Sequence, residues 1–334
     1  MPDILLFSLM VLGGIVVLLT GGDILVRGAT ALASKMGVPP LLVGLTIVAF
    51  GTSAPEMMVS AAAAVEGAPG LAIGNIVGSN IANVLLVLGL PAIIAPIAST
   101  STGIRRNALI ALAFTGLFIA LCWDGGLGLT DGVILSVGIV SYIGFLALTA
   151  KTHRDDPMIA ELTDIDQMEG LPSKAPMVAL FLLGGLVMLP VGAKLIVDGG
   201  VGIAELFNVS DAVIGLTILA FGTSLPELAT AFVAAMRKQG GMAIGNVVGS
   251  NIFNICAVGG ITGVAASVAT GAPAPVEAEF LQFDFWIMAA AALAVLAYAV
   301  LRRPIGRMSG VAMSLAYVGY IAILLLLNPP SLPL

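Results

Sequence analysis

The feature that most constrains the fold is a stretch of thirteen residues that occurs twice. It reads GLTIVAFGTSAPE at 44–56 and GLTILAFGTSLPE at 215–227, with eleven of the thirteen positions identical. Each copy places one glutamate, Glu56 or Glu227, directly after a proline within an apolar run. An ionisable group is costly to keep in such a setting. We therefore treat both glutamates as candidate functional residues.

Composition identifies the chain as a polytopic membrane protein. Hydrophobic residues make up 59% of the 334 residues and charged residues only 10%, which excludes an ordinary soluble domain. The excess of 19 acidic over 13 basic residues disfavours a nucleic-acid partner. The first apolar run, 4–20, has no basic residue before it, and we interpret it as a membrane span and not as a signal peptide.

Ten apolar runs predict an all-α fold with ten transmembrane helices, because about 20 apolar residues cross a bilayer as a helix. The runs cover 4–24, 38–65, 71–95, 104–123, 129–150, 175–197, 210–236, 242–267, 283–301 and 308–327. One markedly polar connection, 151–174, separates the first five from the last five. We therefore predict a five-helix repeat at 1–150, a linker at 151–174 and a second five-helix repeat at 175–334.

The basic residues predict the orientation. Twelve of the 13 Lys and Arg residues fall on the same side of the predicted helices as the 151–174 loop, and Lys194 is the exception. The opposite connections carry acidic residues and neither Lys nor Arg. Because basic connections stay in the cytoplasm, the loop is predicted to be cytoplasmic and both termini to be outside.

The duplication extends beyond the first motif. AIGNIVGSNIAN at 72–83 recurs as AIGNVVGSNIFN at 243–254, at the same offset of 171 residues that relates the two glutamates. Since each half holds an odd number of spans, the two copies must cross the membrane in opposite directions. Inverted repeats around a site near the midplane are typical of secondary transporters.

Charged pairs also recur at this offset, with their signs exchanged. Asp23 and Arg27 lie four residues apart in the first predicted span, and Lys194 and Asp198 lie four residues apart in the sixth. We expect each pair to neutralise itself on one face of its helix. A role in gating is the alternative.

The GTSAPE segment predicts a break within the second span. Gly51 permits unusual backbone angles, and Pro55 removes a backbone donor. Thr52 and Ser53 can bond to nearby carbonyls, and the dipole of the continuing helix eases the charge of Glu56. A carboxylate, hydroxyls and free carbonyls are therefore expected together at this point.

The third span supplies a polar stripe. Asn75, Ser79 and Asn83 recur every four residues and so share one helix face, while neighbouring glycines allow a close approach to other helices. The second half repeats the stripe as Asn246, Ser250 and Asn254. We expect the stripes to face the glutamates, and hydrogen bonding between helices is a competing or additional role.

The ligand chemistry favours hard cations. Two carboxylates with hydroxyl, amide and carbonyl oxygens suit Ca²⁺ and also Na⁺. Cys122 and Cys256 show no metal-binding spacing, and we interpret them as packing residues. The single histidine, His153, is expected to be a solvated loop residue, with a pH-sensing role as the alternative. The alternative for each glutamate is a protonated group buried for packing.

At these motifs the chain resembles the cation/calcium exchanger superfamily, and in particular the prokaryotic sodium/calcium exchangers. The resemblance covers essentially the whole chain and implies an antiporter that exchanges Na⁺ for Ca²⁺ by alternating access in the cell (plasma or inner) membrane. It implies no enzymatic activity, no cofactor and no obligate protein partner. The first and sixth helices are expected to slide across the others.

The resemblance also implies the ion ligands. They are Glu56, Glu227, Thr52, Ser53, Thr223, Ser224, Ser79, Ser250, Asn83, Asn254 and the carbonyls around Ala49 and Ala220. Some relatives carry Asp at one of the positions of Asn83 and Asn254, so the charge available to this site is lower by one. The large calcium-sensing cytoplasmic domain of animal exchangers has no counterpart in the 151–174 loop.

Three other functions remain open at this point. Proton-coupled Ca²⁺ exchange could use the same scaffold, because a desolvated glutamate can exchange a proton near neutral pH. An intramembrane hydrolase could use paired acids, although neither a Ser/His pair nor a metal-hydrolase motif is present. A channel is the third alternative.

Overall fold

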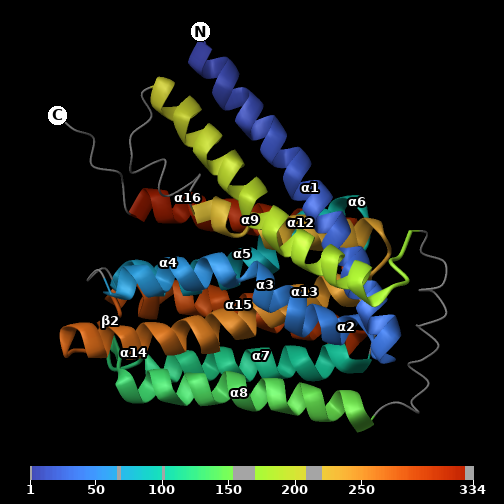
Figure 1. The fold of residues 1–334 in the computed structure, drawn as a ribbon. Helices are drawn as coiled ribbons and strands as arrows, with labels where there is room; N and C mark the ends of the chain where they lie inside the picture. Colours follow the sequence, from blue (N-terminus) through green and yellow to red (C-terminus); the bar gives the residue numbers. More distant parts are fainter. Residues whose placement is uncertain (1, 66–68, 100–101, 153–169, 208–219, 328–334) are drawn as a thin grey trace.

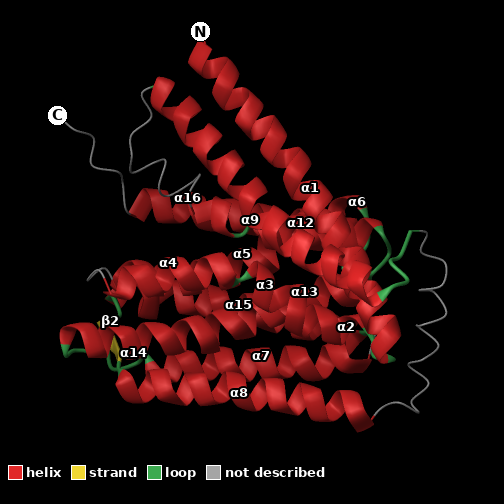
Figure 2. Ribbon diagram, in the orientation of Figure 1, coloured by secondary structure: helices red, strands yellow, loops and turns green. Residues whose placement is uncertain are grey.

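The computed structural model describes residues 2–65, 69–99, 102–152, 170–207 and 220–327, and these residues are almost entirely helical (Figures 1 and 2). Two short strands, β1 (Gly126–Leu127) and β2 (Ala274–Pro275), pair antiparallel and join a loop of the first half to a loop of the second. The predicted all-α fold class is confirmed for this part of the chain.

The helices of the first half follow the predicted spans. They are α1 (Pro2–Met36), α2 (Pro40–Val43), the π-helix η1 (Gly44–Val48), α3 (Ala49–Thr52), α4 (Ala54–Val65), α5 (Pro69–Ala82), the π-helix η2 (Asn83–Leu88), α6 (Gly89–Ile94), α7 (Thr102–Leu121) and α8 (Leu129–Thr152). Three elements, α2, η1 and α3, divide what was predicted as one continuous segment before the break.

The second half repeats much of this order. Its helices are α9 (Ala175–Leu206), α11 (Ala220–Thr223), α12 (Leu225–Met236), α13 (Gly240–Phe253), the π-helix η5 (Asn254–Val258), α14 (Gly259–Thr270), the π-helix η6 (Phe280–Asp284), α15 (Phe285–Leu301) and α16 (Arg307–Leu327). The bounds of α3, α4 and α5 recur at the offset of 171 residues in α11, α12 and α13. The sequence repeat is therefore also a repeat of local structure.

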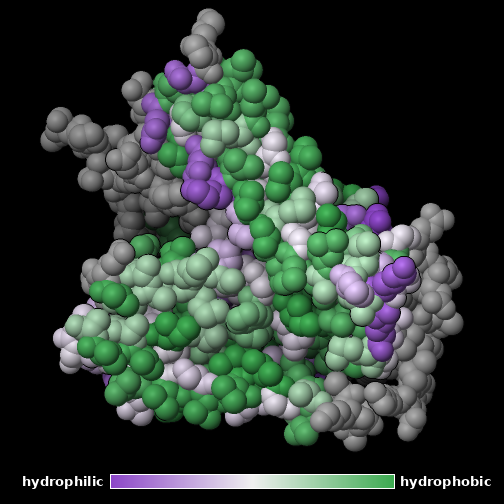
Figure 3. Space-filling model, viewed as in Figure 1, coloured by the Kyte–Doolittle hydropathy of each residue, from purple (hydrophilic) through white to green (hydrophobic). Residues whose placement is uncertain are grey.

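Eight helices among the described residues are long and apolar enough to cross a membrane, and nine if the bent pair Pro40–Thr52 and Ala54–Val65 forms one span. The predicted span 210–236 lies partly outside the described residues, and its described part ends in the shorter apolar helix α12. The chain is thus a multi-pass membrane protein. Figure 3 shows mainly hydrophobic side chains over α7, α8 and α14, as expected for a surface in contact with lipid.

Helices α1 and α9 continue well beyond the ends predicted at residues 24 and 197. The prediction placed each end where the apolar run stops, but the charged residues there pair within the helix. Asp23 accepts a salt bridge of 2.9 Å from Arg27, and Lys194 lies 3.0 Å from Asp198. The predicted pairing is confirmed, and it lets the helices extend. Helix α1 ends only where Gly37 adopts a left-handed conformation with φ of 63°.

Helices α1 and α9 pack side by side and cross the other helices obliquely (Figure 1). Glycines on both helices allow the backbones to touch. A Cβ added to Gly192 would lie 2.7 Å from the Leu18 amide nitrogen and 2.9 Å from the Gly14 carbonyl oxygen. A Cβ at Gly185 would lie 2.9 Å from the Gly21 carbonyl oxygen. The two helices therefore form one closely packed pair.

Replacing Gly192 by valine should force α1 and α9 apart, because backbone atoms of α1 occupy the space that the side chain needs. Overpacking of this kind typically costs about 1–3 kcal/mol of folding free energy, which should lower the thermal unfolding midpoint in detergent. Gly184→Val is the matched control on the same helix, since a Cβ there meets no described atom within 4 Å. Equal midpoints for the two variants would contradict this account of the packing.

Candidate functional site

The predicted helix break is confirmed and lies at Ser53. Helix α3 ends at Thr52, α4 begins at Ala54, and the two segments are bent by 44°. Ser53 has φ and ψ of −83° and 3°, and its counterpart Ser224 has −89° and 4°. Both repeats therefore leave the α-helical conformation at the same residue, one position before the proline-containing first turn of α4 or α12.

Glu56 and Glu227 lie in the first turns of α4 and α12. Their exposed fractions are 1% and 0%, so both carboxyl groups are enclosed by protein. Unpaired amide groups at a helix N-terminus favour a negative charge. The breaks therefore create two places inside the helix bundle where a carboxylate is less costly than elsewhere.

Hydroxyl groups from both halves converge on Glu227. Ser53 Oγ donates to Glu227 Oε1 at 3.2 Å, and Ser250 Oγ donates to the same oxygen at 3.4 Å. Thr52 Oγ1 donates to Asn246 Oδ1 at 3.2 Å and lies 3.5 Å from Ser250 Oγ. Because Thr52 and Ser53 belong to the first repeat and their partners to the second, neither half forms this cluster alone.

The polar stripes face the breaks, as predicted. Asn75 Nδ2 donates to the main-chain oxygen of Glu56 at 3.2 Å and to Ser60 Oγ at 2.8 Å. Asn246 Nδ2 donates to the main-chain oxygen of Glu227 at 3.5 Å. The alternative role of the stripes, hydrogen bonding between helices, is therefore present at these two asparagines.

Close helix contacts bring the second stripe to the first break. Cβ atoms added to Gly245 and Gly249 would lie 2.7 Å from the Leu41 carbonyl oxygen and 2.8 Å from the Leu45 carbonyl oxygen. These glycines let α13 lie directly against α2, η1 and α3. The expected role of small residues on the stripe helices is confirmed for the second repeat.

Several buried side-chain atoms of the predicted site residues have no hydrogen-bond partner in the described structure. They are Glu56 Oε2, Glu227 Oε2, Ser224 Oγ, Asn83 Oδ1 and both polar atoms of the Asn254 amide. Buried polar groups normally bond to protein, water or an ion. The described residues hold no group of three or more His, Cys, Asp or Glu residues that could bind a metal. Carboxylate, hydroxyl and amide oxygens fit a hard cation.

The other predicted site residues lie around this cluster. Ser79 Oγ donates to Asn75 Oδ1 at 3.5 Å. The Ala49 carbonyl oxygen accepts the Ser53 amide at 3.0 Å and Thr52 Oγ1 at 3.3 Å, so hydrogen bonds already engage it in this conformation. Ala220 and Thr223 are the first and last residues of α11.

The remaining sequence predictions concern residues outside the cluster. Cys122 and Cys256 are buried free thiols, which agrees with the predicted packing role. His153 and most of the 151–174 loop lie outside the described residues.

The sequence interpretation missed several buried polar residues, among them Asn80, Asn251 and Asp284. Asn80 and Asn251 follow the stripe serines directly and lie at the crossing of α5 and α13, where Asn251 Nδ2 donates to the Asn80 main-chain oxygen at 3.2 Å. Asp284 ends η6 and accepts a hydrogen bond of 2.7 Å from the Tyr320 hydroxyl. A carboxylate within the apolar run 283–301 was a usable signal for Asp284.

Helix α9 passes closely over both breaks. A Cβ added to Gly51 would lie 2.1 Å from a methyl group of Leu186, and one added to Gly222 would lie 2.2 Å from a methyl group of Val197. Asp23 of α1 also forms an ion pair with Arg237, which caps the end of α12. The closely packed pair of α1 and α9 therefore contacts the two segments that carry the glutamates.

Comparison with known sequences identifies the family. The family described as "Sodium/calcium exchanger protein" matches residues 6–150 and again residues 177–326. The chain belongs to the sodium/calcium exchanger family. This family consists of transporters and not of enzymes. The family-level resemblance of the motifs is thereby confirmed.

Individual members of the exchanger family cover nearly the whole chain. A structure of the sodium-calcium exchanger NCX_Mj soaked with 10 mM Na⁺ and 10 mM Sr²⁺ has a TM-score of 0.80 and 34% sequence identity, covering 96% of this chain and 98% of that one. Sodium/calcium exchanger MaX1 of Methanosarcina acetivorans is 31% identical, covering 95% of this chain and 97% of its own length. Inner membrane protein YrbG of Escherichia coli is 34% identical, with coverages of 97% and 98%.

Asn75→Ala should destabilise this exchanger, because the buried Glu56 carbonyl oxygen and Ser60 hydroxyl lose the amide that holds α5 against α4. Leaving buried polar groups without a partner costs about 1–3 kcal/mol, seen as a lower thermal unfolding midpoint in detergent. Thr115→Ala is the control, since the buried Thr115 hydroxyl bonds only to the Ala111 carbonyl of its own helix. A midpoint lowered no further by N75A than by T115A would argue against the proposed role of Asn75.

Proposed function

We propose that this protein is a secondary antiporter that exchanges Na⁺ for Ca²⁺ across the cell membrane by alternating access. In this proposal ten helices form two inverted five-helix repeats, 1–150 and 175–334, joined by a cytoplasmic linker at 151–174, with both termini outside. The one-sided distribution of Lys and Arg supports this orientation. The inner-membrane assignment in the name of YrbG supports the location.

The observation that carries the proposal is the pair of buried glutamates at the starts of two half-helices, one of which, Glu227, accepts hydrogen bonds from hydroxyl groups of both repeats. In the proposal Glu56, Glu227, Thr52, Ser53, Thr223, Ser224, Ser79, Ser250, Asn83 and Asn254 contribute side-chain oxygens, and the segments at Ala49 and Ala220 contribute carbonyl oxygens. Such a set contains more oxygens than the six to eight that one Ca²⁺ ion takes. The hydroxyl and amide oxygens also suit Na⁺.

Charge compensation provides the coupling. A Ca²⁺ ion balances the two carboxylates, and bound Na⁺ ions balance them in the alternative loaded state. Without cations, two buried charges would remain uncompensated in a medium of low dielectric constant. We propose that α1 and α9 can slide across the breaks only when the site is loaded, so the two ions must take turns. The names of MaX1 and NCX_Mj favour Na⁺ and Ca²⁺ as the two ions.

Glu56→Gln and Glu227→Gln should each abolish Na⁺-driven Ca²⁺ uptake into proteoliposomes, because one carboxylate no longer balances a divalent cation. Apparent Ca²⁺ affinity should fall by about 100-fold or more, the scale expected on removing one partner of a buried charge pair. Asp284→Asn is the matched control, since Asp284 is a buried acid whose partner is Tyr320 and not the cluster. Normal exchange in E56Q or E227Q would refute the site.

A proton gradient should not replace the Na⁺ gradient. Proteoliposomes loaded with Ca²⁺ in Na⁺-free buffer should show no Ca²⁺ release when only a pH difference is imposed. The reason is that the hydroxyl and amide oxygens of the proposed site suit Na⁺ as the counter-ion, whereas a proton would need only a carboxylate. The same vesicles should release Ca²⁺ when external Na⁺ is added. Release driven by the pH difference alone would instead identify a proton-coupled exchanger on the same scaffold.

A further inference from the structure

A network of four buried asparagines lies where the two repeats cross. Asn83 Nδ2 donates to Asn251 Oδ1 at 3.0 Å, and Asn251 Nδ2 donates to the main-chain oxygen of Asn80 at 3.2 Å. All four residues, including Asn254, are buried. Asn80 and Asn251 occupy equivalent positions in the repeats, as do Asn83 and Asn254. If the two repeats had the same conformation, Asn254 would therefore donate to Asn80 as Asn83 donates to Asn251.

The mirror bond is not formed. Neither polar atom of the Asn254 amide has a hydrogen-bond partner within the described structure, and Asn80 Oδ1 also lacks one. Asn80 Nδ2 instead donates to the Ile76 carbonyl oxygen of its own helix at 2.7 Å. Four residues that are identical in pairs thus adopt two different arrangements, one in each repeat.

The hydroxyl groups around the glutamates show the same imbalance. Ser53 and Ser250 both donate to Glu227. Their counterparts behave differently, because Ser224 Oγ has no hydrogen-bond partner among the described residues and Ser79 Oγ donates to Asn75. The asparagines and the serines therefore both depart from the repeat symmetry. In each case a bond is formed by a residue of one repeat, and the equivalent bond in the other repeat is absent.

In a transporter built from inverted repeats, exchanging the conformations of the repeats exchanges the side from which the site is open. A bond present in only one repeat must then break as its mirror image forms. We propose that Asn251 and Asn80 are positioning residues. Asn251 holds Asn83 in one access state, and Asn80 holds Asn254 in the other. This inference rests on the proposed function and adds two residues outside the set of ion ligands.

The bond gives Asn83 a defined orientation. Its Nδ2 is held by Asn251, so its Oδ1, which has no partner in the described structure, stays available as an oxygen ligand. The unbonded Asn254 amide has no such restraint. In the mirror state Asn80 would orient Asn254 in the same way. In each state, one positioning residue therefore fixes the side-chain oxygen of either Asn83 or Asn254 in an orientation suited to ion binding.

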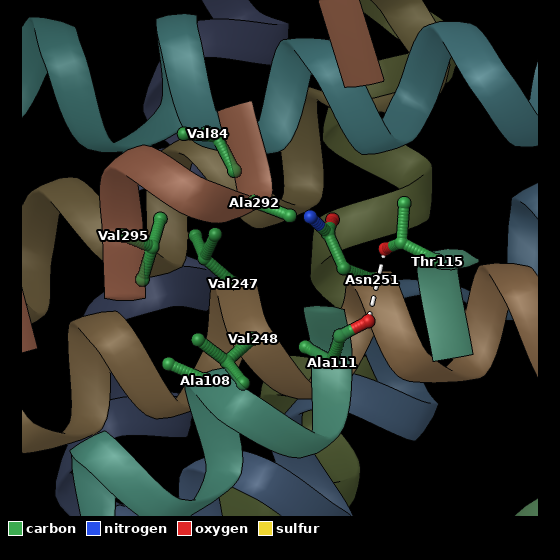
Figure 4. Close-up of a pocket in the computed structure, with 9 residues that line it drawn as sticks. All are labelled: Val84, Ala108, Ala111, Thr115, Val247, Val248, Asn251, Ala292 and Val295. Atoms are coloured by element: carbon green, nitrogen blue, oxygen red, sulfur yellow. Dashed lines mark hydrogen bonds between the residues drawn. The ribbon is translucent and has the colours of Figure 1, made fainter. Parts of the chain in front are cut away.

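The packing around Asn251 is not completely filled. A cavity of about 10 Å³, roughly the space of one water molecule, lies beside its side chain. Figure 4 shows Asn251 facing this cavity together with Thr115, among small and β-branched side chains such as Val84 and Ala292. The side chains around Asn251 are therefore small, and they leave unfilled space beside it.

The test compares the two faces of the membrane. Apparent Ca²⁺ affinity is measured for Na⁺-dependent exchange in right-side-out and in inverted vesicles from the same cells. Asn251→Ala removes two bonds of the state seen here, those with Asn83 and Asn80. Asn80→Ala removes one bond of this state, that to Ile76, and the two corresponding bonds of the mirror state, so each variant disfavours its own state by one bond. The ratio of the two affinities should shift by about fivefold, and the shifts for the two variants should have opposite directions. About fivefold is the change that one hydrogen bond produces in a two-state equilibrium. A general loss of structure would not produce opposite shifts.

Three further variants make the outcome decisive. The double variant N80A/N251A should return the ratio close to that of the wild type, because both states lose the same number of bonds. Asn107→Ala should leave the ratio unchanged, since Asn107 is a buried amide bonded to Tyr142 and Gly103 within the first half. If an alanine variant is not folded, Asn→Ser at the same position replaces it with the same expected direction.

Failure of the inference is distinct from failure of the proposed function. Equal or unidirectional shifts in N80A and N251A, with Na⁺-dependent exchange retained, would overturn the roles of these asparagines and leave the antiporter intact. Absence of Na⁺-dependent Ca²⁺ exchange in the wild-type vesicles would overturn both.

Discussion

The structure depends on the cost of placing two carboxylates inside a helical membrane protein. Glu56 and Glu227 are almost fully enclosed, and an uncompensated charge in such surroundings is strongly unfavourable. Each helix breaks at a serine three residues before its glutamate, so each carboxyl group lies in the first turn of a new helix, where the helix dipole favours a negative charge. The polar stripes on α5 and α13 then donate to the main chain of these same turns. The helix breaks and the hydrogen bonds from Asn75 and Asn246 therefore both lie at the two buried carboxylates.

Glycine residues allow the helices to pack closely around the buried glutamates. Large side chains would keep α13 away from the first break, whereas Gly245 and Gly249 let it touch the backbone of the neighbouring segments. Glycines on α1 and α9 do the same for the pair that crosses over the breaks. In a membrane, close packing of this kind replaces much of the hydrophobic effect, which does not drive one apolar helix towards another. The cluster and the pair of α1 and α9 that crosses it therefore rely on the same residue type for close packing.

The sequence was sufficient to predict features determined by local chemistry. The all-helical class, the break at GTSAPE and the inward direction of Asn75 follow from apolar length, proline and helical spacing. Features that depend on the other half were not accessible. Asn80 lies off the stripe of Asn75, Ser79 and Asn83, and only the position of α13 reveals that it meets Asn251. The length of α1 was underestimated because Asp23 and Arg27 were treated as a membrane boundary, although their pairing continues the helix.

The imbalance between the repeats carries information that the sequence motifs cannot contain. Eleven of thirteen residues are identical in the first motif, yet Ser53 bonds across to Glu227 while Ser224 makes no corresponding bond to Glu56. Near-identical sequences would be expected to form near-identical contacts if both sets could exist together. Ser53 and Asn83 of the first repeat form their bonds, whereas Ser224 and Asn254 of the second repeat do not form the equivalent ones. We infer that the two sets of bonds exclude each other within one structure. In the alternating mechanism proposed above, near-identity of the motifs has a physical reason, because it would keep the two arrangements close in free energy.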